Sequence, residues 1–144
     1  FFGVGIDRRQ RIVKDQDRRV GENGQIFTML KFRTMQTNAE EQRRMVEKRD
    51  ENGNRILKQR DDPRVTRIGK LLRQTSLDEI PQLLNVLDGS MSLVGPRPEL
   101  PDFVDEYKPW QRKRFAVPQG ITGWWQVNGR SDHPMHMHTE DDLY

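Results

Sequence analysis

Two adjacent carboxylates, Asp78 and Glu79, have the clearest potential for chemistry in this sequence. They lie in the stretch SLDEIPQLLNVL, residues 76–87. Proline lacks an N–H and clashes with the preceding helical turn, so Pro81 requires any helix here to begin close to Asp78. A carboxylate at a helix start lies at the positive end of the helix dipole, which favours the ionised form that a nucleophile or metal ligand needs. Neighbouring helical residues diverge by about 100°, so one acid could attack while the other holds a cation.

The same spacing also has a purely structural interpretation. Ser76 and Glu79 match the S-x-x-E pattern of a capping box, an ordinary signal for the start of a helix. The cap would be Ser76 or Asp78 itself. The spacing alone therefore favours capping over catalysis.

Several basic residues lie where an anion could bind. Arg97 lies between two prolines in GPRPEL, residues 95–100, so a stiff loop would present its guanidinium for bidentate phosphate recognition. Arg130 occurs in NGR, and Lys31 and Arg33 are two residues apart in KFRTM, on the same side of an expected strand. An exposed turn or a solvent-facing strand explains each of them equally well.

Histidines and tryptophans give weaker signals. The three histidines of HPMHMH, residues 133–138, are close enough to bind a transition metal, but no known metal signature surrounds them, so we expect an exposed loop. Trp110 and the pair Trp124–Trp125 could stack on a base, lie at a membrane interface or fill the core. We expect at least one member of the pair in the core, and the other would point away from it if the segment is extended.

The composition suggests an anionic partner. The 144 residues contain no cysteine, which excludes disulfides and thiol nucleophiles, and no apolar stretch long enough to span a membrane. Residues 1–75 hold 19 Lys/Arg against 11 Asp/Glu, whereas residues 76–144 hold 6 against 11. A basic first half suits a phospholipid surface, a nucleic acid or a phosphorylated small molecule, although a salt-bridged surface explains it as well.

The elements that must position these residues are short. We expect a turn at GENG followed by a strand over 25–35, and a charged helix over 39–51 that opens with a capping box at Thr37 and Glu40. The acidic pair opens a helix over 77–87, which Asp88-Gly89 ends. Further expectations are a strand over 91–95, short helices over 101–107 and 109–115, and a strand or loop pair over 121–130.

A second helix precedes the acidic pair. Asp62 would cap it and Pro63 would be its first helical residue. Its apolar and basic residues would form separate stripes: Val65, Ile68, Leu71 and Leu72 on one, and Arg64, Arg67, Lys70 and Arg73 on the other. The whole is a small mixed α+β domain of short helices, several of them amphipathic and of the membrane-surface type, with a short β-hairpin or small sheet.

Three blocks of this sequence together resemble the bacterial sugar transferase family, the monotopic polyprenyl-phosphate phosphoglycosyl transferases. The blocks are KFRTM, the long run TRIGKLLRQTSLDEIPQLLNVLDGSMSLVGPRPEL, and GITGWWQVNGRS. The resemblance extends from about residue 13 to the C-terminus and does not rest on one short motif. It implies that residues 1–144 are a single catalytic domain, truncated at both ends, without the family's N-terminal re-entrant membrane helix and its C-terminal segment.

The resemblance implies a two-step transfer. A UDP-sugar donates its sugar 1-phosphate to undecaprenyl phosphate and UMP is released, which initiates the assembly of a lipid-linked capsule, O-antigen or other exopolysaccharide. By analogy with the family, Asp78 is the nucleophile and forms a covalent aspartyl-phosphosugar. Glu79 helps to hold Mg²⁺ on the diphosphate.

Family arginines match three positions of this sequence, Arg73, Arg97 and Arg130. The resemblance implies that they bind the phosphates of donor or acceptor, and Lys31 and Arg33 match the KFRTM motif with a less defined role. The family's catalytic domain lies on the cytoplasmic leaflet of the bacterial inner membrane, which the basic stripe of the second helix would suit. A homodimer is possible and no nucleic-acid partner is expected.

Two other functions are compatible with parts of the sequence. A non-enzymatic basic module that binds nucleic acid or anionic lipid would explain the charge of the first half and the tryptophans. Its affinity for nucleic acid would fall steeply with salt and would not depend on Asp78. A catalytically silent scaffold is the other possibility, and the intact acidic pair argues against it.

Overall fold

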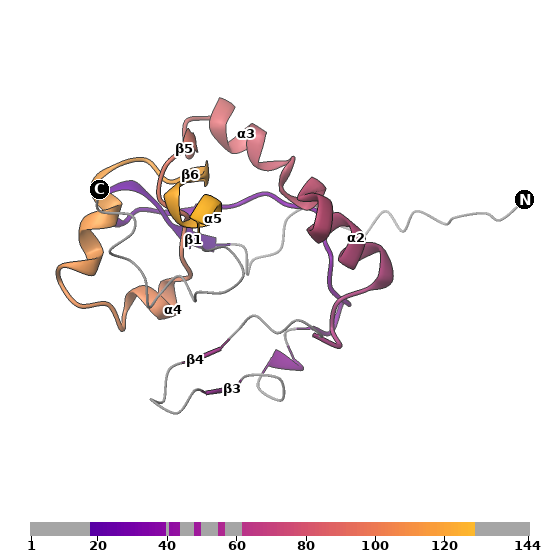
Figure 1. The fold of residues 1–144 in the computed structure, drawn as a ribbon. Coiled ribbons are helices and arrows are strands. Elements are labelled where there is room, and N and C mark those ends of the chain that lie inside the picture. Colours follow the sequence, from indigo (N-terminus) through magenta and orange to yellow (C-terminus); the bar gives the residue numbers. More distant parts are fainter. Residues whose placement is uncertain (1–17, 40, 44–47, 50–54, 57–61, 129–144) are drawn as a thin grey trace, which may run out of the picture.

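The computed structural model describes residues 18–39, 41–43, 48–49, 55–56 and 62–128. These residues form short helices and three separate two-stranded sheets, which confirms the expected small α+β domain (Figure 1). The elements in chain order are β1 (Arg18–Val20), η2 (Glu22–Gly24), β2 (Ile26–Thr28), β3 (Lys48–Arg49), β4 (Arg55–Ile56), α2 (Arg67–Thr75), η3 (Leu77–Glu79), α3 (Gln82–Leu87), β5 (Ser92–Val94), α4 (Pro101–Val104), η4 (Gln111–Ala116), β6 (Gly120–Thr122) and α5 (Trp124–Asn128).

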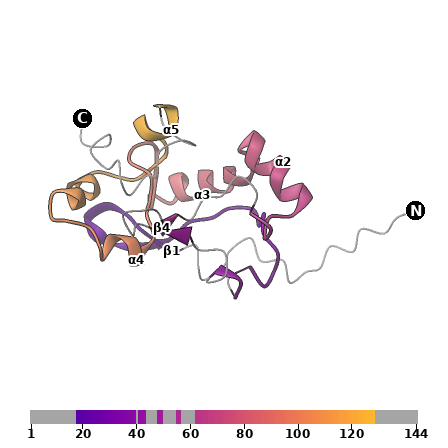
Figure 2. The same cartoon turned by 60° about the horizontal axis from the view of Figure 1, so that its bottom comes forward.

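Strands β1 and β2 form the predicted hairpin around GENG. They pair antiparallel, and Asn23 and Gly24 adopt the left-handed conformation, with φ of 55° and 76°, that the tight turn requires. Val20 at the end of β1 belongs to a small core with Val104, Tyr107 and Phe115. The hairpin is thereby packed against α4 and η4, and Figure 2 shows α4 beside β1.

The chain beyond β2 stays extended, but it is not the continuous strand predicted over 25–35. Its backbone bonds with the helical segments beside it instead of with a sheet. The Leu30 N–H donates to Asn85 Oδ1, the Phe32 N–H to the Asp78 carbonyl and the Thr66 N–H to the Thr34 carbonyl, at 2.9, 2.9 and 3.0 Å. A single bridge from Met35 to Val65 follows. The KFRTM motif therefore lies along the segment that carries the acids, as the indigo trace between β1 and α2 shows in Figure 1.

Helix α2 begins four residues later than predicted. Thr66 caps it, with its hydroxyl accepting from the Gly69 N–H at 2.9 Å, and Asp62 and Pro63 lie in the preceding turn. The Asp62 carboxylate is held by Arg64, which donates through Nη2 at 2.6 Å and through Nε at 2.9 Å. Arg64 is buried and does not belong to an exposed basic stripe, so that part of the prediction is wrong.

The predicted helix over 77–87 forms as a 3-10 turn, η3, followed by α3, and Gly89 ends it at a φ of 84° as expected. Ser76 adopts the left-handed conformation and makes no capping side-chain bond, so the serine cap is wrong. The buried residues of this run are Pro81 and the polar Asp78, Gln82 and Asn85. Its exposed residues are apolar: Leu77, Ile80, Leu83, Leu84 and Leu87. The run is therefore amphipathic with its polar face buried and its apolar face exposed.

Strands β5 and β6 pair in parallel, with Ser92 opposite Gly120 and Val94 opposite Thr122. Glycine is needed at this crossing because a Cβ on Gly120 would meet the Gly95 nitrogen at 2.1 Å. The strand predicted over 91–95 is confirmed, and α4 and η4 are shorter versions of the two predicted helices. The tryptophans lie on the helix α5 instead of a strand. Trp125 is buried, as expected for at least one of the pair, and Trp124 is 65% exposed on a helix instead of an extended segment.

The charged helix predicted over 39–51 is wrong at its C-terminal end, whereas Arg43 is helical and residues 40, 44–47 and 50–51 lie outside the described residues. Lys48–Arg49 and Arg55–Ile56 form the strands β3 and β4, which pair antiparallel. Glu40 of its capping box lies outside the described residues. The helical expectation was based on the capping box and the charged run after it, whereas pairing with a neighbouring strand decides the conformation of Lys48–Arg49.

Candidate active site

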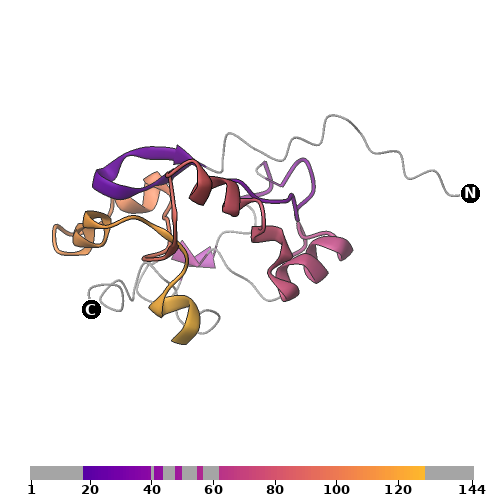
Figure 3. The same ribbon diagram turned by 90° about the horizontal axis from the view of Figure 1, so that it is seen from above.

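The acidic pair lies at the bend between α2 and α3. Asp78 is 5% exposed, and its carbonyl accepts from the Phe32 N–H, which fixes the acid against the KFRTM segment. Glu79 follows in the same turn, and its N–H donates to the Ser76 carbonyl at 3.2 Å. Figure 3 shows this bend from above, between the two helices. The tight turn therefore places both acids next to a second segment of the chain.

Arg97 is brought to Glu79 from the opposite side. Its Nη2 donates to Glu79 Oε1 at 2.6 Å, and both side chains are largely buried, with 19% and 14% exposure. The stiff loop predicted for GPRPEL thus directs its guanidinium at the acidic pair. The expectation of an exposed turn is wrong for this arginine.

Lys31 and Arg73 surround Asp78 with positive charge. Burial raises the pKa of Asp78 most strongly, the charge of Lys31 lowers it, Glu79 raises it and Arg73 lowers it. Arg73 is fixed by a 2.9 Å bond from its Nε to the Thr34 hydroxyl. Burial lowers the pKa of Arg73, and the Asp78 charge opposes that effect. We expected a helix start to keep Asp78 readily ionised, but desolvation outweighs it.

No direct contact with the acidic pair is described for the other predicted basic residues, Arg33 and Arg130. Arg33 is half-buried on the extended segment, and its Nε lacks a hydrogen-bond partner within the described part of the chain. Arg130 lies outside the described residues, as does the HPMHMH segment. The structure therefore brings Lys31, Arg73 and Arg97 around the acids and leaves the placement of Arg130 open.

Sequence reasoning missed two buried amides on the same helical run. Asn85 accepts from the Leu30 N–H and donates to the Thr28 carbonyl and the Ser90 hydroxyl, so it fixes the start of the KFRTM segment. Gln82 is 1% exposed, and its Nε2 has no partner among the described residues. The sequence pattern could have indicated these amides, because Asp78, Gln82 and Asn85 recur at helical spacing and so lie on one face of the helix.

The donor atoms around Glu79 limit how a metal could bind. Within the described ranges, no group of three or more His, Cys, Asp or Glu side chains could hold a metal ion. Mg²⁺ commonly uses one or two carboxylates and completes its shell with water and substrate phosphate. The acidic pair fits a Mg²⁺ that is shared with a diphosphate.

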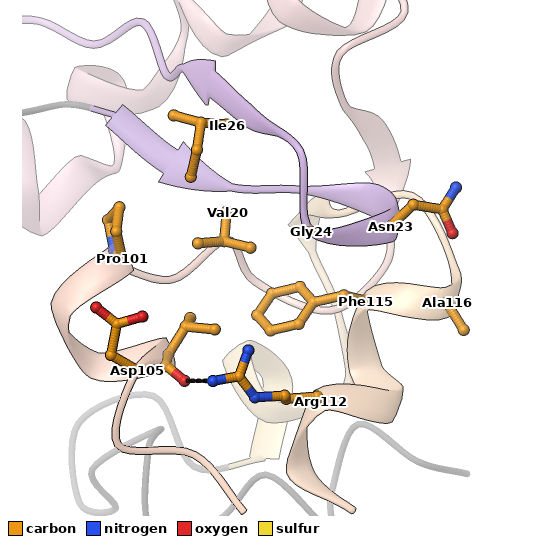
Figure 4. Close-up of a pocket in the computed structure, with 10 residues that line it drawn as sticks. Val20, Asn23, Gly24, Ile26, Pro101, Asp105, Arg112, Phe115 and Ala116 are labelled. Carbon is orange, nitrogen blue, oxygen red and sulfur yellow. Dashed lines mark hydrogen bonds between the residues drawn. The ribbon is translucent and has the colours of Figure 1, made fainter. Parts of the chain in front are cut away.

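A separate hollow of about 480 Å³ lies between the hairpin, α4 and η4 (Figure 4). Val20, Ile26, Phe115 and Arg112 are among the residues that line it, and none of the predicted site residues does. Arg112 donates from Nη2 to the Val104 carbonyl at 2.8 Å. The acidic pair is therefore not part of this hollow.

Comparison with known proteins decides the family. The family described as bacterial sugar transferase matches residues 3–144. The chain belongs to the bacterial sugar transferase family. The resemblance found in the motif blocks is thereby confirmed over nearly the whole sequence.

Curated members of the bacterial sugar transferase family align with most of the chain. Galactosyl transferase CpsE of Streptococcus agalactiae is 46% identical over 114 residues, which are 79% of this chain and 25% of the relative. UDP-galactose-lipid carrier transferase of Erwinia amylovora is 45% identical over 118 residues, 79% and 25% of the two chains. Undecaprenyl-phosphate galactose phosphotransferase of Salmonella typhimurium is 42% identical over 118 residues, again 79% and 25%. The chain thus spans about a quarter of the length of these relatives.

Proposed function

We propose that this chain transfers a sugar 1-phosphate from a UDP-sugar to undecaprenyl phosphate, releasing UMP. The observation that carries the proposal is the buried Asp78 carboxylate, next to the Arg97–Glu79 pair and under the charges of Lys31 and Arg73. A buried acid among cations suits attack on an anionic phosphate. The names of the Erwinia and Salmonella relatives, a UDP-galactose-lipid carrier transferase and an undecaprenyl-phosphate galactose phosphotransferase, support this substrate class.

The proposed reaction has two displacements at one phosphorus atom. An Asp78 carboxylate oxygen attacks the sugar-proximal phosphorus, an O–P bond forms, and the bond to the UMP phosphate breaks with its electron pair leaving on UMP. In the second step a phosphate oxygen of undecaprenyl phosphate attacks the same phosphorus, and the Asp78 carboxylate leaves. The product is the sugar joined to undecaprenyl through a diphosphate, the first intermediate of a lipid-linked glycan.

The basic residues around the acids stabilise the ionised form of Asp78 and bind the phosphates of the substrates. Lys31 and Arg73 both lower the pKa of Asp78 and so oppose its burial. Arg97, with Arg33 and Arg130 as further candidates, binds phosphate oxygens of donor or acceptor. Arg73 keeps its place through Thr34, so the KFRTM segment aligns the cations with the acid.

Glu79 is the residue that we propose holds Mg²⁺ together with the donor diphosphate. Bound there, the ion would neutralise charge on the diphosphate and on the departing UMP. Arg97 forms an ion pair with the same carboxylate. Substrate binding would then exchange one positive partner of Glu79 for another.

We further propose that the exposed apolar residues of α2 and of the helical run over 77–87 face the cytoplasmic leaflet of the bacterial inner membrane. Leu84 and Leu87 on α3 are 56% and 82% exposed, and Ile68 and Leu71 on α2 are 73% and 60% exposed. Among the described residues no helix is long and apolar enough to cross a bilayer, whereas exposed leucines on short amphipathic helices suit binding in the plane of its surface. The acids on the buried face of the same run would then lie close to a lipid acceptor.

The deciding experiment measures UMP release by the natural protein with a panel of UDP-sugars, Mg²⁺ and undecaprenyl phosphate. We expect release that requires the metal and is lost in Asp78→Asn. Mass spectrometry of protein and donor alone should find a sugar-phosphate adduct on the Asp78 peptide. Full activity of Asp78→Asn would overturn the nucleophile assignment. Salt-sensitive nucleic-acid binding without any UMP release would favour the non-enzymatic alternative.

A further inference from the structure

A buried polar network lies behind the loop that carries Arg97. Its members are Glu99, Tyr107 and Arg114, with exposed fractions of 8%, 7% and 1%. Arg114 is a full positive charge in the interior of a small domain, where an unpaired charge would be strongly unfavourable. Arg114 therefore needs hydrogen-bond partners in the interior. These partners indicate which part of the chain Arg114 holds in position.

Arg114 donates in two directions at once. Its Nη1 donates to the Tyr107 hydroxyl at 3.2 Å, and its Nη2 donates to the Arg97 carbonyl at 2.9 Å. The Tyr107 hydroxyl in turn reaches Glu99 Oε2 at 3.4 Å. The guanidinium thus connects a buried acid to the backbone of Arg97.

Arg114 is itself well fixed. Gln119, which is fully buried, donates from Nε2 to the Arg114 carbonyl at 3.1 Å. The Phe115 ring lies 5.8 Å from the Arg114 guanidinium carbon and stacks on Tyr107 with ring centroids 6.4 Å apart. Arg114, which donates the hydrogen bond to the Arg97 carbonyl, is therefore held in place by the core.

The loop leaves Arg97 little freedom of its own. Pro96 and Pro98 flank it and are buried, and the Pro96 carbonyl accepts from the Gly120 N–H at 2.9 Å. With both neighbours fixed, the position of the Arg97 carbonyl decides where its side chain begins. From there the side chain reaches Glu79 at 2.6 Å.

We propose that Arg114 is a positioning residue that holds Arg97, through its backbone carbonyl, in place for binding the donor diphosphate. This inference rests on the proposed function, in which Arg97 binds phosphate oxygens, and it narrows that role to the diphosphate of the donor. Arginine suits the task because its planar fork donates to two acceptors in fixed directions, which a lysine ammonium cannot reproduce. In this proposal Arg114 acts on the donor through Arg97, whose carbonyl it holds.

The first test compares Arg114→Lys and Arg114→Met with Arg112→Met in the natural protein. Arg112 is the matched control because it lies on the same element, η4, and also donates to a backbone carbonyl, that of Val104, but faces the separate hollow (Figure 4). We expect the Arg114 variants to raise the KM for the UDP-sugar about 10- to 100-fold, the loss typical when residues that orient metal ligands are replaced. The KM for undecaprenyl phosphate and both KM values of the control should stay within about twofold.

A merely structural role would give a different result, since a smaller folded fraction lowers the apparent kcat and leaves both KM values unchanged. In an Arg97→Ala background, a further Arg114→Lys substitution should not change the donor KM, because its route of action is gone. Equal effects in both backgrounds, or an unchanged donor KM in Arg114→Lys and Arg114→Met, would overturn the inference. If Arg114→Met does not fold, Tyr107→Phe takes its place, with a smaller rise in the donor KM expected.

A second readout does not depend on activity. Crystal structures of Arg114→Lys and Arg112→Met should show the Arg97–Glu79 ion pair broken in the first and intact in the second, and an intact pair in both contradicts the inference. Equilibrium binding of UDP should weaken in parallel in Arg114→Lys. If the unsubstituted protein neither binds UDP nor releases UMP, the proposed function fails, while the structures still decide whether Arg114 positions Arg97.

Discussion

The guanidinium of Arg97 and the carboxylate of Glu79 form a largely buried ion pair at 2.6 Å, although 18 residues separate them in the chain. The pair joins the proline-flanked loop to the acidic bend and neutralises Glu79 beside the buried Asp78. A like charge next to Asp78 raises its pKa, so the neutralising partner of Glu79 influences the nucleophile as well. Five predictions test this arrangement and the elements that support it.

Asp78→Asn should remove transfer activity and stabilise the fold. Loss of a covalent nucleophile lowers kcat by about 10⁴-fold or more, which UMP release would measure. Burial raises the pKa of Asp78, so the folded state favours its protonated form, and that advantage is lost as pH rises through the folded pKa. At neutral pH the neutral amide should therefore raise the Tm. The gain in Tm should disappear in acid, where Asp78 is protonated in both the folded and the unfolded state. A lower Tm of Asp78→Asn at neutral pH would contradict the raised pKa of Asp78.

The acid limb of the pH–rate profile should move in opposite directions in two variants. Lys31→Met removes a charge that lowers the Asp78 pKa, so the rise of kcat should shift to higher pH. Glu79→Gln removes a charge that raises it, so any residual activity should rise at lower pH. The rate of adduct formation measured against pH reports both shifts, and shifts of the same sign would exclude Asp78 as the titrating group.

Gly69→Ala should destabilise the domain and impair the site. A Cβ at this position would lie 2.0 Å from the Thr34 carbonyl oxygen, so α2 and the KFRTM segment would have to separate. Overpacking of this kind typically costs about 1–3 kcal/mol of unfolding free energy. Because Arg73 is held by Thr34, activity should fall as well. Urea unfolding measures the loss, with the exposed Gln74→Ala on the same helix as control.

Arg64→Met should be destabilising and should alter the response to acid. The side-chain bond from Arg64 lowers the pKa of Asp62. This stability is present above the unfolded pKa of about 3.9 and is lost as pH falls through the folded pKa. Leaving Asp62 buried without its partner should cost about 3–5 kcal/mol at neutral pH. Urea unfolding across pH should show a much smaller loss in acid, and the exposed Arg67→Met serves as control.

Leu84→Glu with Leu87→Glu should weaken binding to anionic phospholipid vesicles. Both side chains are exposed, so we expect the Tm to change by less than about 2 °C because little packing is lost. Co-sedimentation with vesicles should fall by at least about tenfold, since two apolar contacts become two charges. Ile26→Glu is the control, because it places one such charge on an exposed apolar residue at the separate hollow. If binding is unchanged and the oligomeric state shifts instead, the apolar surface is a contact between copies.

The sequence by itself determined the local features of the site. The adjacent acids, the proline that makes a helix begin at them, the glycine that ends it and the stiff loop around Arg97 all depend on backbone preferences within a few residues. The hairpin turn at Asn23 and Gly24 is of the same kind. The family could also be recognised, because its motifs are contiguous blocks.

The tertiary structure decided which side of each element faces the interior. A helix with one apolar and one polar face usually buries the apolar one, but here the polar face is buried because Asn85 and the Asp78 carbonyl bond to the backbone of the extended segment. The ion pair of Arg97 with Glu79, the Asp62–Arg64 turn that delays α2 and the pairing of β3 with β4 depend likewise on contacts between segments. Such contacts depend on where the folded chain brings its parts together, and this overrides local propensity.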